Sequence, residues 1–253
     1  MASRWGRDPP TYGFGVPDAP DVPVPLLEGM ATARAVRRFR PDPIPDDDLA
    51  SILWHATRAP SGSNRQPTRF LVLRDGEGAQ AAKTLLGDAF RSGWNEKRRD
   101  DGYETGSGGD PSSPKARMAA AMQHFVDHFE EIPVVVLACL KLGHYRENQL
   151  SSGGSVYPAC QNLLLAARAL GYGGVMTMWH GYVEPQLRST LAIPDDFVIA
   201  ATIALGRPQG GHGPVRRRPL DEVVYDDRWG ERAPWAVDPP GTRFAGGPRQ
   251  VLP

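Results

Sequence analysis

Residues 157–178, with the sequence YPACQNLLLAARALGYGGVMTM, decide the fold class of this chain. Leucine and alanine dominate residues 157–170, and their spacing predicts a helix. The glycines that follow lead into a short apolar run over 173–178, which is typical of a buried strand. A helix therefore directly precedes a strand in this part of the chain.

The same alternation continues on both sides of this stretch. Uninterrupted β-branched and apolar runs predict further strands, and apolar residues at helical spacing predict further helices. The strands are expected at 68–73, 134–140 and 198–205, and the helices at 46–59, 79–99, 118–129 and 184–191, with a short helix from residue 26 that ends before Pro41. Alternation of this kind indicates a layered α+β domain with helices around a central sheet.

Charge and composition exclude several classes of protein. The 29 Lys and Arg residues balance 29 Asp and Glu residues, so the chain lacks the one-signed charge of a general nucleic-acid or anionic-membrane binder. The longest apolar runs, 132–140 and 197–205, are far shorter than the roughly 18 residues of a membrane helix. Only two cysteines occur, both in apolar segments, and no apolar leader begins the chain, so we expect a reduced, cytoplasmic protein.

Glycine and proline, 28 and 25 residues, divide the chain into segments. Prolines make residues 1–25 an N-terminal arm, and Pro and Gly make residues 231–253 a C-terminal arm. The domain is expected to span 26–230, with a lid-like excursion over 95–115 whose centre, 102–114, is rich in Gly, Ser and Pro. A loop of that length within a domain suggests a functional role.

Several familiar catalytic patterns are absent from the sequence. The chain has no G-x-S-x-G elbow and no P-loop, and its paired glycines do not complete a dinucleotide-binding fingerprint. His124 and His128 stand four residues apart, as in some metal sites, but no third ligand is evident, so a packed or solvated pair is favoured. We therefore expect no metal site, and we assign Cys139 and Cys160 to the core.

Two groups of arginines point to phosphate binding. Arg34, Arg37 and Arg38 have the spacing that would place them on one side of a helix end, and Arg216, Arg217 and Arg218 follow the last predicted strand. Guanidinium groups bind phosphate in a bidentate manner, so the two clusters together could clamp one phosphate. The alternative, open for either cluster alone, is solvated surface charge.

Two further segments offer close backbone approach and small polar groups. Residues 59–67, APSGSNRQP, separate a predicted helix from a strand and suit a polar planar ring or a ribityl chain, although alone they are also an ordinary turn. Residues 173–181, GGVMTMWHG, end a predicted strand in glycine beside an aromatic residue, and the alternative there is a plain strand end.

Taken together, these stretches resemble the FMN-dependent nitroreductase family. The matching segments are RAVRRF at 34–39, the region from Ile44-Pro45 through APSGSNRQP at 59–67, QNLLLAARALG at 161–171, and RRRPLDEV at 216–223. The resemblance covers roughly residues 26–230 in order. It implies a three-layer α+β fold with a mostly antiparallel central sheet, in an intertwined homodimer that binds FMN at the subunit interface. In such a dimer the two arms would lie on the partner.

The resemblance also implies which residues bind the cofactor. Arg34 and Arg37 would hold the phosphate and ribityl end, and Arg216 with either Arg217 or Arg218 would complete the clamp. The segment 60–64 would reach the flavin of the partner chain, and a backbone N–H within 178–181 would bond flavin N5. The full set is Arg34, Ala35, Val36, Arg37, Arg38, Pro60, Ser61, Gly62, Ser63, Asn64, Met178, Trp179, His180, Gly181, Arg216, Arg217 and Arg218.

The implied function is an NAD(P)H oxidoreductase that reduces flat electron-poor acceptors, nitroaromatics or quinones, by ping-pong transfer through flavin N5. No catalytic side chain is then required, because the cofactor carries the reactive atom. Trp94, Tyr103 or Trp179 could stack on a planar substrate, and buried structural aromatics are the alternative.

Rival functions are a family member with a dedicated substrate, a flavin or deazaflavin sequestering protein, and an unrelated α+β protein that binds phosphorylated metabolites. Thr68, where relatives usually carry an aromatic residue, and the 95–115 excursion fall where substrate would be recognised.

Overall fold

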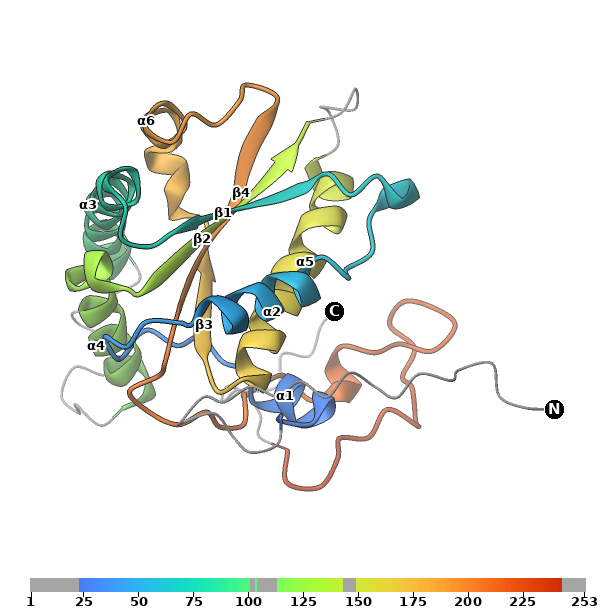
Figure 1. The fold of residues 1–253 in the computed structure, drawn as a ribbon. Coiled ribbons are helices and arrows are strands. Elements are labelled where there is room, and N and C mark those ends of the chain that lie inside the picture. Colours follow the sequence, from blue (N-terminus) through green and yellow to red (C-terminus); the bar gives the residue numbers. More distant parts are fainter. Residues whose placement is uncertain (1–22, 101–102, 104–112, 143–148, 243–253) are drawn as a thin grey trace.

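A four-stranded antiparallel sheet forms the centre of the molecule. In the computed structural model, which describes residues 23–100, 103, 113–142 and 149–242, the strands are β1 (Thr68–Leu73), β2 (Val134–Lys141), β3 (Gly173–Thr177) and β4 (Phe197–Gly206). Their order across the sheet is β1-β2-β4-β3, with every pair antiparallel (Figure 1). The four predicted strands are confirmed to within one residue or two at each end.

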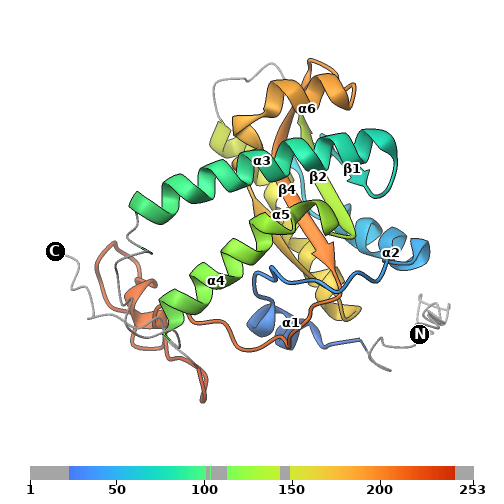
Figure 2. The same cartoon turned by 90° about the vertical axis from the view of Figure 1, so that its left-hand side faces the viewer.

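Helices cover both faces of the sheet. On one face lie α1 (Leu26–Thr32), α2 (Asp46–Ala56) and α5 (Gln149–Ala169), and on the other lie α3 (Glu77–Asp100), α4 (Pro114–Asp127) and α6 (Glu184–Thr190). Figure 2 shows α3, α4 and α6 in front of the sheet with α2 and α5 behind it. The expected three-layer α+β fold with an antiparallel sheet is confirmed.

The central strands build two separate cores because alternate side chains of a strand point to opposite faces. Along β2, Val135 and Leu137 belong to the core under α3, whereas Val134 and Val136 belong to the core under α5. A bulge in β4 at Ala200 changes this alternation, since Ala138 pairs with Ala201 and Cys139 with Ile199. Ile199 consequently joins the α3 core, together with Leu187 of α6.

A buried polar network connects α2 with the start of β3 and the end of β4. The Tyr172 hydroxyl donates to Asp48 Oδ2 at 2.5 Å, and the Arg207 guanidinium lies 4.9 Å from the centre of the Tyr172 ring. All three residues are buried. Burial, and then the neighbouring Asp48 carboxylate, raises the pKa of Tyr172, so the phenol remains a donor at every physiological pH.

Replacing Tyr172 by Phe is expected to lower the free energy of unfolding by about 1–3 kcal/mol, because the buried Asp48 carboxylate loses its donor. Urea denaturation measures this change. Tyr157→Phe is the control, since its exposed hydroxyl lies 3.4 Å from the Ala200 carbonyl oxygen. Equal stabilities of Tyr172→Phe and the unchanged protein would show that the network carries no net stabilisation.

Three expectations about element boundaries are wrong. The helix α5 begins at Gln149 rather than at 157 and continues through Pro158, which removes one backbone donor without ending the helix. The first helix stops at Thr32, and residues 33–45 form no helix but make isolated bridges at Ala35 and Phe39. The predicted excursion over 95–115 is shorter, because α3 runs to Asp100 and α4 begins at Pro114. Most of the glycine-rich centre of the excursion, most of the N-terminal arm and residues 243–253 of the C-terminal arm lie outside the described residues.

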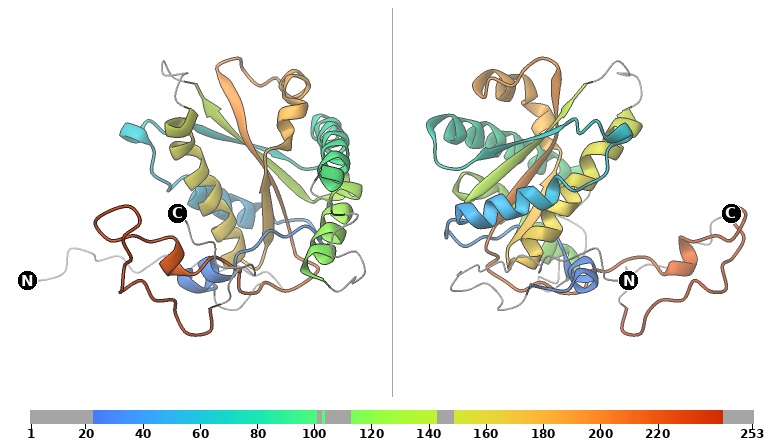
Figure 3. Two further views of the ribbon diagram at one scale, coloured as in Figure 1. Left: turned by 180° about the vertical axis from the view of Figure 1, so that it is seen from behind. Right: turned by 45° about the vertical axis from the view of Figure 1, so that its right-hand side comes forward.

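Residues 219–242 leave the body of the protein (Figure 3). This segment contains the short helix η4 (Leu220–Glu222) and carries exposed aromatic side chains: Trp229 is 88% and Trp235 65% solvent-exposed. Among the helices that the structure describes, none is long and apolar enough to cross a membrane.

Candidate functional site

An extended segment, residues 33–39, extends the sheet at the edge of β3. Val36 N donates to Gly174 O at 3.0 Å, and Ala35 pairs with Gly174 in the parallel sense. Glycine is required at position 173 for this approach, because a Cβ there would lie 2.5 Å from Val36 Cγ2. At Gly174 a Cβ would instead lie 2.7 Å from Ala204 O of the neighbouring strand β4. Gly173 thus allows the segment that carries the first arginine cluster to lie against the sheet.

The first arginine cluster does not lie on a helix, so the expected reason for its grouping was wrong. Arg34, Arg37 and Arg38 follow the end of α1 on extended backbone, because the β3 edge offers hydrogen bonds that a longer helix would forgo. The grouping itself is nevertheless found. Arg34 and Arg37 line the same pocket as Arg216 and Arg217, although the two clusters are about 180 residues apart in sequence.

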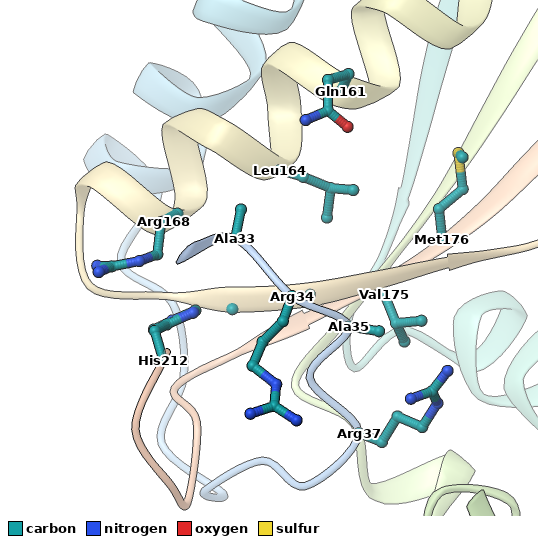
Figure 4. Close-up of a pocket in the computed structure, with 12 residues that line it drawn as sticks. Ala33, Arg34, Ala35, Arg37, Gln161, Leu164, Arg168, Val175, Met176 and His212 are labelled. Atoms are coloured by element: carbon teal, nitrogen blue, oxygen red, sulfur yellow. The ribbon is translucent and has the colours of Figure 1, made fainter. Parts of the chain in front are cut away.

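Two adjoining pockets share Arg34, Ala35 and Arg37. The smaller, about 190 Å³, lies between the extended segment, β3 and α5. Figure 4 shows Arg34 near Arg168 and His212, with Gln161 and Met176 farther along the pocket. The larger, about 730 Å³, lies between the extended segment, the start of α4 and the loop 208–217.

Positive charge dominates the larger pocket. Its lining contains Arg34, Arg37, Arg38, Arg117, Arg216 and Arg217, and no carboxylate among the described residues. Within the described ranges, Arg34, Arg37, Arg38, Arg216 and Arg217 form no ion pair with a carboxylate. Arg218 differs, because its Nη1 forms an ion pair with Glu222 Oε2 at 3.8 Å and the residue lines neither pocket.

Arg37 has an unsatisfied donor. Its Nε is buried and has no hydrogen-bond partner among the described residues. Burial, and then the nearby Arg34 charge, lowers the pKa of Arg37. Two arginines that line one pocket, one of them with an unused buried donor, are a suitable receptor for a phosphate group.

The smaller pocket contains two residues that sequence reasoning missed. His212 Nε2 lies 3.2 Å from Tyr172 O, and its Nδ1 is buried without a partner in the described structure. Burial, and then Arg168, lowers the pKa of His212, so the ring is neutral at pH 7. Arg168 donates from Nε to Thr32 Oγ1 at 3.3 Å. Arg168 stands in the segment that resembles the family, but nothing in sequence indicated that α5 would place it beside the arginine cluster.

Residues 178–181 form the turn that follows β3. Met178 is half-exposed, and the turn continues into η3 (Trp179–Tyr182), where Trp179 packs edge-on against Phe90 with ring centres 5.7 Å apart. The side chain of His180 is 4% exposed, and its Nε2 donates to Ile199 O at 2.7 Å. The β4 bulge thus anchors this turn, and the Met178 side of the turn faces solvent.

The neutral state of His180 predicts a stability that depends on pH. Burial lowers the pKa of His180 below the roughly 6.5 of an unfolded histidine. The unfolded chain therefore binds more protons below that pH, so stability is full above it and decreases as the pH falls, by at most about 1.4 kcal/mol per pH unit. We expect His180→Gln to reduce the loss of unfolding free energy between pH 7.5 and 5.5. The control is His55→Gln, at an exposed position, and an equal pH dependence in both variants would contradict the assignment.

Residues 60–64 lie apart from the arginines within one chain. They enclose η1 (Gly62–Asn64), and Gly62 N donates to Ser155 Oγ at 3.1 Å near the start of α5. Arg168 is 13 residues farther along that helix, which corresponds to about 20 Å at 1.5 Å per residue. A single chain therefore does not bring the two predicted halves of the site together.

The candidate substrate aromatics have different environments. Trp94 is 1% exposed, and its Nε1 donates to Gln123 Oε1 at 2.9 Å, which favours the structural alternative for this residue. The ring of Tyr103 lies 5.4 Å from that of Trp94. Of the three candidates, Trp179 alone lies in the turn that follows β3.

The comparison with known families decides the classification. The model of the nitroreductase family matches residues 30–207, a span that includes the extended segment, all four strands and the turn after β3. The chain belongs to the nitroreductase family. The family resemblance in the sequence is thereby confirmed.

Relatives and solved structures agree with this classification. An NADH dehydrogenase of Thermus thermophilus is 28% identical over 81% of this chain and 98% of its own length. A candidate NADH dehydrogenase/NAD(P)H nitroreductase of Archaeoglobus fulgidus is 30% identical over 72% of this chain and 85% of its own. A candidate nitroreductase of Desulfovibrio desulfuricans, solved in complex with FMN, is 25% identical, with a TM-score of 0.58 over 81% of this chain and 98% of that one.

Proposed function

We propose that this nitroreductase-family protein is an FMN-dependent NAD(P)H oxidoreductase that reduces flat electron-poor acceptors, nitroaromatics or quinones. The observation that carries the proposal is that Arg34, Arg37, Arg216 and Arg217 line one pocket without carboxylate partners in the described structure. The FMN-bound relative and the names of the two curated relatives support it.

The donor set fits FMN. Guanidinium groups match a phosphate dianion, and the buried Arg37 Nε needs an acceptor. We assign Arg34, Arg37, Arg216 and Arg217 to the phosphate end, with Arg217 rather than the Glu222-paired Arg218 as the second member of its cluster. The backbone of residues 178–181, anchored by His180, would donate a hydrogen bond at flavin N5.

FMN supplies, when bound, a ring that accepts hydride from NAD(P)H and returns reducing equivalents to an acceptor. The protein groups bind and orient: the arginines fix the phosphate, and the neutral His180 holds its turn without adding charge near the ring. Backbone donors at a position where negative charge develops stabilise the reduced form of the cofactor. No side-chain nucleophile or general base is needed for this chemistry.

The proposed site is shared between two chains of an intertwined homodimer. The separation of residues 60–64 from the arginines along α5 supports this arrangement, in which Gly62 of the partner subunit and Asn64 of the partner subunit contact the flavin. The protruding segment 219–242 also supports it, because exposed tryptophans that leave the body of one chain are suited to burial against another.

Replacing Trp229 and Trp235 by serine is expected to weaken the dimer at least tenfold, since each buried tryptophan contributes roughly 2 kcal/mol or more. Sedimentation equilibrium should give about 55 kDa for the unchanged protein, twice the 27.6 kDa of one chain, and a smaller average mass for the variant. Because both side chains are exposed in one chain, circular dichroism should be unaltered. A monomeric unchanged protein, or a variant with full dimer affinity, would contradict the arm contact.

Steady-state kinetics distinguish the proposal from its rivals. With a nitroaromatic or a quinone as acceptor, double-reciprocal plots at several NAD(P)H concentrations should be parallel, as expected for ping-pong exchange at one site. A sequestering protein would bind flavin without turnover. An enzyme with a dedicated substrate would be reduced by NAD(P)H but would not be reoxidised by either acceptor.

A further inference from the structure

We propose that the larger pocket binds the 2′-phosphate of NADPH beside the FMN phosphate, so that this protein uses NADPH in preference to NADH. The inference rests on the proposed function and names the reductant for that site. It is carried by an excess of positive charge, by the size of the pocket and by the apolar surface that accompanies the arginines.

One phosphate does not balance the charge of the pocket. Five arginines, Arg34, Arg37, Arg38, Arg216 and Arg217, line it without an ion pair to any carboxylate that the structure describes. A phosphate monoester carries a charge of about −1.5 to −2 at pH 7, which leaves roughly three positive charges uncompensated. Clustered like charges repel one another, so a second anionic group in the same pocket would relieve that repulsion.

The arginines divide between the two pockets. Arg34 and Arg37 line both of them, whereas Arg38, Arg216 and Arg217 line the larger pocket alone. With Arg34, Arg37, Arg216 and Arg217 assigned to the FMN phosphate, Arg38 remains for a second phosphate. Arg38, which the family resemblance placed among the FMN-binding residues, is thus assigned to the reductant instead.

The rest of the lining suits an adenine ring. At about 730 Å³ the pocket has the volume of a site for a whole small molecule, far more than a single phosphate requires. Apolar groups complete its wall: Met118 and Ala121 from α4, and Pro208, Pro214 and Val215 from the loop after β4. A planar apolar ring joined to a phosphorylated ribose combines the two kinds of group that this lining recognises.

NADPH and NADH differ only in the 2′-phosphate. A comparison of the two nucleotides therefore isolates the contribution of the 2′-phosphate from that of the pyrophosphate, which both contain. The probes for binding are adenosine 2′,5′-bisphosphate and adenosine 5′-monophosphate, titrated calorimetrically into the flavin-loaded protein. We expect the bisphosphate to bind at least tenfold more tightly. Arg38→Gln should reduce that preference about tenfold or more, because it removes a charge-assisted phosphate contact.

The kinetic counterpart is the ratio of kcat/KM for NADPH to that for NADH, which should fall with the same substitution. Arg74→Gln is the matched control, since Arg74 is exposed, pairs with Asp46 and lies outside both pockets. Equal affinity of the unchanged protein for the two probes would overturn the inference. Equal losses with NADPH and NADH, or loss of FMN from Arg38→Gln, would overturn it as well.

Failure of the proposed function gives a different result from failure of this inference. A protein that takes up no FMN, seen in its absorption spectrum before any nucleotide is added, would contradict the proposed function. A flavin-loaded protein that is reduced equally well by NADH and NADPH would leave the proposed function intact and would overturn the 2′-phosphate site.

Discussion

Replacing Arg34 and Arg216 together by alanine is expected to lower the affinity for FMN by roughly a hundredfold or more. Each substitution removes a charge-assisted phosphate contact of about 1.5–3 kcal/mol, and the two residues come from two separate segments that line one pocket. Quenching of flavin fluorescence during titration of the apoprotein measures this affinity. The flavin content of the purified variant should fall in parallel.

Riboflavin makes the test specific, because it has the same ring and ribityl chain but no phosphate. The double variant should bind riboflavin about as well as the unchanged protein does, so its preference for FMN over riboflavin should disappear. Arg74→Ala, outside both pockets, should retain that preference. A double variant that still prefers FMN by the original factor would show that the phosphate lies elsewhere.

Gly173→Val is expected to disrupt both the sheet edge and the site. The new Cβ would lie 2.5 Å from Val36 Cγ2, so the segment that carries Arg34 and Arg37 must move away from β3. Overpacking of this kind costs about 1–3 kcal/mol, and loss of the hydrogen bond from Val36 N to Gly174 O adds to it. We expect lower stability in urea and at least tenfold weaker FMN binding.

A second substitution tests whether the effect passes through this contact. Val36→Gly removes the atoms that the new side chain would meet, so combining it with Gly173→Val should restore part of both the stability and the FMN affinity. The control is Gly76→Val, at a position where a Cβ meets no atom within 4 Å. Additive losses in the combined variant would contradict the proposed link between the glycine and the arginine segment.

Much of the fold could be predicted from sequence. The segments that form β2 and β4 are short, uninterrupted apolar runs rich in β-branched residues, and such runs are typical of strands that are buried on both faces. The extended segment could not be predicted, since Ala33, Arg34 and Ala35 favour a helix locally and only the distant β3 edge makes extended backbone preferable. The early start of α5 was missed for a similar reason: glycines and Pro158 weaken the local helical pattern, whereas packing against α2 and the sheet sustains it.

The candidate site was predictable in its chemistry and less so in its geometry. Two arginine clusters in a chain of zero net charge indicated a phosphate, and the structure places Arg34 and Arg37 with Arg216 and Arg217. The sequence alone left open which of the tandem arginines takes part, because that depends on the pairing of Arg218 with Glu222. Arg168 and His212 were missed because their place in the pocket depends on how α5 and a glycine-rich loop pack beside β3.

Anaerobic titration of the purified, flavin-loaded protein with NADPH tests the central claim most directly. The account predicts a protein that contains one FMN per chain and whose flavin absorbance is bleached by one equivalent of NADPH, and then returns when a quinone or a nitroaromatic is added. A colourless protein that takes up no FMN would contradict the account, and so would a bound flavin that NADPH and NADH both fail to bleach.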